Sequence, residues 1–140
     1  MKKILFVVAL LFCLLSNAQN QTNSYSSKQI EVFIKEVFGD SADELVFKSE
    51  TDRLQLITDF FSRVEVKYVP ELRGKGFKSL DDVKLSNKYN SGLKRDVNVN
   101  LSTFNPLKYD VSMLPKEREI YRIGNTDYIL IIKPVENTIN

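Results

Sequence analysis

The stretch Arg118-Glu-Ile-Tyr-Arg-Ile-Gly-Asn-Thr-Asp-Tyr-Ile-Leu-Ile-Ile-Lys-Pro134 decides the fold, because its pattern predicts a β-hairpin. Gly124-Asn125 is typical of a two-residue type II′ turn, in which glycine takes a positive φ that other residues resist. This turn sets three opposite pairs: Ile123 with Thr126, Arg122 with Asp127, and Tyr121 with Tyr128. The charged pair and the aromatic pair both favour that register.

The second half of the hairpin, Ile129-Leu130-Ile131-Ile132, is apolar at every position. Successive side chains of a strand point to opposite faces, so this run predicts a central strand that is covered on both sides. Pro134 is expected to end the strand, because proline has no amide hydrogen for the ladder.

The beginning of the chain resembles a bacterial Sec signal peptide. A basic Met1-Lys2-Lys3 precedes an apolar run over 4–15, and Ser16-Asn17-Ala18 has the small residues of a cleavage site. The apolar run is shorter than the roughly 20 residues that span a bilayer. Cys13 follows Phe12 and is followed by more apolar residues, so we do not expect lipidation. We expect cleavage after Ala18 and export to the periplasm or beyond, the alternative being an uncleaved membrane anchor.

Removal of residues 1–18 leaves 18 basic and 18 acidic residues, so the mature chain is neutral. Nucleic-acid binding normally needs a clearly basic domain, and we therefore expect no such partner. No later apolar run is long enough to span a membrane. We expect a disordered leader over 19–26, a single globular domain over 27–135 and a tail over 136–140.

The residue types that are missing exclude several classes of chemistry. The chain has no histidine, and its one cysteine, Cys13, leaves with the predicted signal peptide. Serine-histidine and cysteine-histidine catalysis are thereby excluded, as are histidine-based zinc, copper and haem sites. The Asp-x-Asp-x-Asp-Gly loop of a calcium site is also absent. We expect no disulfide, no metal and no cofactor.

Periodicity upstream of the hairpin predicts helices first and strands later. The apolar residues over 27–38 and 50–62 recur at helical spacing, and Ser27 and Ser49 are candidate N-caps. Strands are expected at 64–69, 96–101, 107–113, 118–123 and 127–133. Helices followed by strands favour an α+β fold, in which the two helices cover one face of an antiparallel sheet of about four to five strands.

Two loops are candidate binding sites. Arg73 and Lys75, interleaved with glycines, and nearby Lys78 could bind an anion, although the spacing is not that of a phosphate-binding loop. The alternative is a solvated loop that balances the acidic helices. Asn105, Lys108 and Tyr109 lie in a stretch rich in aromatic and turn residues that could form a binding platform. The alternative there is a turn whose Phe104 and Leu107 enter the core.

Carboxylates supply the remaining candidates. Arg122 and Asp127 could line a polar pocket, or simply fix the hairpin register. The pair Asp81-Asp82, or Glu65 with Glu71, could act in glycoside hydrolysis if two carboxyl groups faced each other. The sequence favours an exported, non-catalytic protein of the cell envelope that binds an unknown protein or small ligand. Alternatives are a carrier or sensor with an apolar cavity between helices and sheet, and a carboxylate-based hydrolase.

Overall fold

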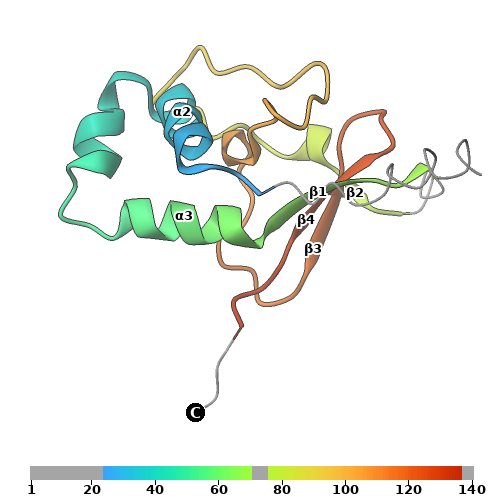
Figure 1. Cartoon of the computed structure of the whole chain (residues 1–140). Coiled ribbons are helices and arrows are strands. Elements are labelled where there is room, and N and C mark those ends of the chain that lie inside the picture. The colour runs from blue at the N-terminus through green and yellow to red at the C-terminus, as the bar shows by residue number, and fades with distance from the viewer. Residues whose placement is uncertain (1–23, 71–75, 137–140) are drawn as a thin grey trace, which may run out of the picture.

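The computed structural model describes residues 24–70 and 76–136 and has the α+β fold that the sequence predicts. Helices α2 (Ser27–Phe38) and α3 (Arg53–Arg63) precede a sheet with four strands: β1 (Val64–Tyr68), β2 (Lys78–Ser79), β3 (Glu119–Arg122) and β4 (Tyr128–Ile132). Figure 1 shows α2 beside α3, with β1 continuing directly from α3 and the long segment between β2 and β3 passing over α2. The predicted signal peptide 1–18 lies outside the described residues.

Helix α2 is positioned by a cap at each end. Its N-cap is Ser26, one residue before the predicted Ser27. The Ser26 hydroxyl accepts from the Gln29 amide (3.3 Å), and the Gln29 side chain accepts from the Ser26 amide (3.0 Å). This reciprocal capping box outcompetes Ser27, which lacks the glutamine three residues on. The helix ends at Phe38, as predicted, and Gly39 follows it with a φ of 53°, which is open to glycine and strained for other residues.

The second helix begins later than predicted. The chain first forms a 3-10 turn (Gly39–Ser41) and a π-helical turn (Asp43–Phe47), and α3 starts at Arg53 rather than at residue 50. Ser49 is not its cap, because the Ser49 hydroxyl accepts from the Thr51 amide (3.1 Å) and closes a turn ahead of the helix. The buried face of α3 holds Ile57, Phe60 and Phe61.

The sheet has the order β1-β4-β3-β2, with antiparallel pairs except for a short parallel pair between β2 and β3. The predicted strands 96–101 and 107–113 are wrong. Val97 is 91% exposed, so the alternating apolar pattern there does not mark a buried face. The Asn100 carboxamide oxygen accepts from the Ser102 amide (3.0 Å), which turns the chain. Pro106–Lys108 is a 3-10 turn, and Leu85 and Tyr109 form only an isolated bridge.

The hairpin forms, but its register differs from the predicted one by two residues. Arg122 lies opposite Ile129 and Tyr121 opposite Leu130. The turn is wider than two residues, because the Thr126 hydroxyl donates to the Ile123 carbonyl (2.6 Å) and accepts from the Tyr128 amide (3.1 Å). A shift of two keeps every side chain on its predicted face. Asp127 therefore lies in the turn and is not the cross-strand neighbour of Arg122.

The prediction that β4 is a central strand buried on both faces is confirmed. It lies between β1 and β3, and Ile129 to Ile132 are all at most 7% exposed. Leu130 and Ile132 join the core formed with the helices. Ile129 and Ile131 point to the opposite face, beside Glu65 and Lys67 of β1.

Candidate functional site

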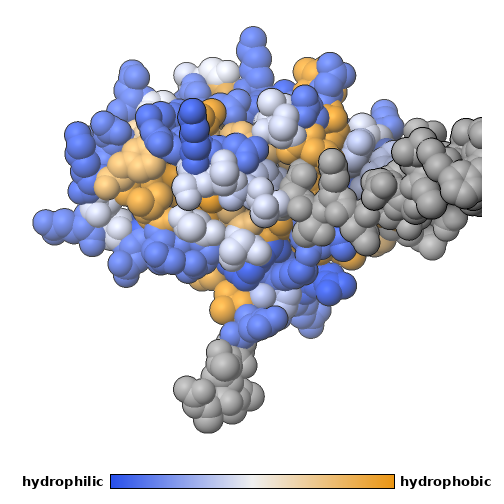
Figure 2. All heavy atoms as spheres, viewed as in Figure 1, coloured by the Kyte–Doolittle hydropathy of each residue, from blue (hydrophilic) through white to orange (hydrophobic). Residues whose placement is uncertain are grey.

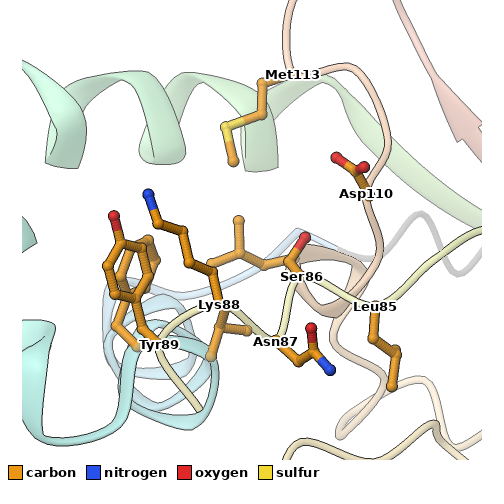
Figure 3. Close-up of a pocket in the computed structure, with 10 residues that line it drawn as sticks. Leu85, Ser86, Asn87, Lys88, Tyr89, Asp110 and Met113 are labelled. Atoms are coloured by element: carbon orange, nitrogen blue, oxygen red, sulfur yellow. The ribbon is translucent and has the colours of Figure 1, made fainter. Parts of the chain in front are cut away.

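A pocket of about 350 Å³ lies between the C-terminal end of α2 and two loops, 85–89 and 107–113. This position is at the side of the helices and not between the helices and the sheet. The pocket is lined by Val37, Phe38, Leu85, Ser86, Asn87, Lys88, Tyr89, Leu107, Asp110 and Met113. The floor of the pocket is formed by the buried apolar residues Val37, Phe38 and Leu107. Its rim carries exposed polar residues, among them Lys88 and Asp110. In Figure 3, Tyr89 and Lys88 form one side of the pocket, and Asp110 and Met113, both from the loop 107–113, lie across from them.

Backbone hydrogen bonds hold the two loops together at the pocket. The Ser86 amide donates to the Lys108 carbonyl (2.7 Å), and the Asp110 amide donates to the Lys84 carbonyl (2.8 Å). The second loop is shaped by Asn105, whose side-chain oxygen accepts from the Leu107 amide (3.0 Å) and begins the 3-10 turn. Ser86 and Asp110 are thus fixed relative to each other by main-chain contacts, which a change of side chain leaves in place.

The loop 85–89 is also anchored on α2. The Tyr89 ring stacks on Phe38, with centroids 5.4 Å apart and 19° between the planes. The Asn90 side chain donates to the Glu36 carbonyl near the end of the helix (2.8 Å). That carbonyl belongs to the last turn of α2, where carbonyl groups lack intrahelical partners. The aromatic wall of the pocket is therefore set by the helix end.

Behind the pocket a buried cation joins the second loop to α2. Lys108 is 5% exposed, and its amine contacts Glu36 Oε1 (2.7 Å) and Asp96 Oδ1 (2.6 Å). The Asn105 side chain donates to Glu36 Oε2 (2.9 Å) and to the Phe33 carbonyl (3.1 Å). Burial alone lowers the pKa of Lys108, but hydrogen bonds with Asp96 and Glu36 outweigh burial and raise it. Lys108 therefore stays charged and ties three segments together.

The structure brings the predicted binding-loop residues together, but inside the protein. Asn105, Lys108 and Tyr109 are each at most 5% exposed. Their polar atoms contact Glu36, Asp96 and main-chain groups rather than solvent. Phe104 and Leu107 enter the core, as the alternative prediction stated.

The other predicted candidates do not converge on the pocket. Of the predicted anion site, Arg73 and Lys75 lie outside the described residues, and Lys78 is exposed on β2. Glu71 also lies outside them, while Glu65 is held by Lys67 (2.9 Å) and by Lys133. Asp81 and Asp82 form an exposed 3-10 turn.

A second hollow of about 500 Å³ lies along α2 and includes Val32, Phe33 and Glu36 on the helix and Ser102 and Thr103 opposite. Most of the polar side chains around this hollow already have partners within the protein. Both carboxylate oxygens of Glu36 have partners, and the Gln29 amide donates across the hollow to the Ser102 carbonyl (3.1 Å). We therefore regard the pocket beside Tyr89 as the better ligand site.

Comparison with protein-family models, with curated proteins and with solved structures found no match to this chain. Over residues 24–70 and 76–136, no group of three or more acidic, cysteine or histidine side chains could hold a metal ion. None of the helices in that part of the chain has the length and apolarity needed to cross a bilayer.

The pocket was not predictable as a site from the sequence. The segment from Asn87 to Gly92 reads as a turn, and Met113 falls in a predicted strand. No motif links them to the end of α2. The one local signal is the aromatic Tyr89 in an otherwise polar segment, since an aromatic side chain in a turn usually packs against something.

Proposed function

We propose that this protein is an exported, non-catalytic binding protein of the cell envelope that holds a small, largely apolar ligand in the pocket beside Tyr89. The observation that carries the proposal is the pocket itself, about 350 Å³ with a floor of Val37, Phe38 and Leu107. Ligand pockets in proteins are mostly apolar hollows of roughly 300–1,000 Å³ with a few polar groups, and this one lies at the small end.

Export is supported by the signal-like pattern of residues 1–18. A small ligand is better supported than a large protein partner. A protein partner would favour a broad apolar surface, whereas Figure 2 shows hydrophobic atoms in separate patches among hydrophilic ones on the face in view. A hydrolase is less well supported, because the pocket contains a single carboxylate, that of Asp110, and glycoside hydrolysis uses two.

Filling the pocket tests this proposal. N-phenyl-1-naphthylamine is an uncharged apolar probe whose fluorescence rises when it leaves water. We expect the purified protein to bind it saturably at one site. We expect Met113→Trp to weaken binding at least tenfold, because the larger ring occupies the pocket. The backbone is not expected to move, since the Met113 contact with Arg63 (2.6 Å) is made by its main-chain carbonyl.

The matched control is Tyr68→Trp, which places the same side chain on β1 at a position 60% exposed and outside the pocket lining. It should bind the probe like the natural protein. Circular dichroism would establish that both variants are folded. Equal binding by Met113→Trp and the natural protein would refute this pocket as the ligand site.

A further inference from the structure

Two opposite charges flank the opening of the pocket. Lys88 and Asp110 are both exposed, and Figure 3 places them on opposite sides of the opening with Met113 between them. Of the described residues, none forms a salt bridge with either side chain. The Lys88 amine lies 5.1 Å from the centre of the Tyr89 ring, a cation–π contact, and it donates no hydrogen bond to any of the described residues. The pocket therefore has an apolar floor and, at its rim, two charges that no described residue pairs with.

From this charge arrangement, and resting on the proposed function, we propose that the ligand is a small zwitterion with an apolar side group, such as an apolar amino acid. Its apolar group lies on Phe38 and Leu107, its anionic group faces Lys88, and its cationic group faces Asp110. Contacts of the two loops hold the residues that carry these charges beside the pocket. The main-chain amide of Asp110 donates to the Lys84 carbonyl. The Lys88 amine lies over the Tyr89 ring, and that ring stacks on Phe38.

Electrostatics explains why a zwitterion fits better than a singly charged ligand. An anion would pair with Lys88 but would also lie near the Asp110 carboxylate, which repels it. A cation would pair with Asp110 but would be repelled by the Lys88 amine. The zwitterion pairs with both charges. Both side chains are exposed, so each contact is screened, and we expect each to change affinity only about two- to fivefold. The charges thus select among ligands that the apolar floor already accepts.

Four phenylalanine derivatives that share the same side chain but differ in charge test the contribution of each ligand charge to binding. At pH 6, L-phenylalanine is a zwitterion, N-acetyl-L-phenylalanine an anion, L-phenylalaninamide a cation and N-acetyl-L-phenylalaninamide neutral. Calorimetric titration of the purified protein should give the tightest binding for the zwitterion. Loss of either charge should weaken binding about two- to fivefold, and loss of both should weaken it about four- to 25-fold.

Two variants assign the charges to residues. Lys88→Gln should remove the preference for ligands with a carboxylate and keep the preference for an amine, whereas Asp110→Asn should do the opposite. Lys94→Gln is the control, since Lys94 is an exposed lysine outside the pocket lining. Equal affinities for all four ligands, or identical effects of the two variants, would overturn the zwitterion proposal. If the naphthylamine probe still bound saturably in that case, the proposed function would stand without the zwitterion proposal. If the probe did not bind either, both proposals would be refuted.

Discussion

Replacing Lys108 by methionine is expected to reduce the free energy of unfolding by about 3–5 kcal/mol, the usual loss when one partner of a buried ion pair is removed. Methionine has similar length but no charge, so Glu36 and Asp96 would face each other without the cation that now lies 2.7 and 2.6 Å from them. Urea unfolding at pH 7 would measure the loss. The matched control is Lys35→Met, which removes an exposed pair with Glu31 on α2 and should have a much smaller effect.

A compensated variant separates charge from packing. Lys108→Met combined with Glu36→Gln and Asp96→Asn leaves no uncompensated carboxylate, so we expect it to recover most of the lost stability. If the triple variant were no more stable than Lys108→Met, the loss would come from packing and the ion pairs would not be its cause.

The same network predicts a dependence on alkaline pH. The folded state holds the pKa of Lys108 above its ordinary value of 10.5, so its contribution is fully present below about pH 10 and is lost as the pH rises through the raised pKa. The stability difference between the natural protein and Lys108→Met should therefore stay constant up to about pH 10 and shrink at higher pH.

The second large effect is expected in β4, where Leu130→Ala and Ile131→Ala should each reduce the free energy of unfolding by about 2–5 kcal/mol. The two residues are adjacent, and their side chains point to opposite faces of the sheet. Leu130 is 0% and Ile131 7% exposed, so each substitution leaves a cavity on its own face. Denaturant unfolding of both variants is the measurement. Val97→Ala, at a position 91% exposed, is the control and should change stability little. A large loss for only one of the two would mean that one face of β4 contributes little.

The helices and the hairpin were predictable because the residues that specify each of them lie close together in the sequence. Each helix buries a face whose residues recur at helical spacing, and Ile129 to Ile132 are apolar on both faces. The predicted hairpin register was wrong because the hydrogen bonds of the Thr126 hydroxyl widen the turn. These side-chain hydrogen bonds outweigh the preference of a glycine-asparagine pair for a two-residue turn. The strand β2 spans only Lys78–Ser79, too short to show a period.

The residues around the pocket show why a site of this kind is hard to predict. Asn105 and Lys108 are polar and follow a turn signal, so the sequence suggests an exposed loop. Their burial depends on Glu36, which reaches them from α2 and is distant in the chain. The pocket likewise depends on contacts between distant segments: Tyr89 on Phe38, and the main-chain bonds that join 84–86 to 108–110. No single segment of the sequence therefore contains a pattern from which the pocket could be predicted.

The most direct test of ligand binding in this pocket is an assigned amide chemical-shift titration of the purified protein with N-phenyl-1-naphthylamine. The proposal predicts that the shifted amides cluster at Ser86 to Tyr89, at Asp110 and Met113, and at the end of α2, and that they saturate together. Shifts confined to the hollow around Val32, Ser102 and Thr103, or no saturable shifts at all, would contradict it.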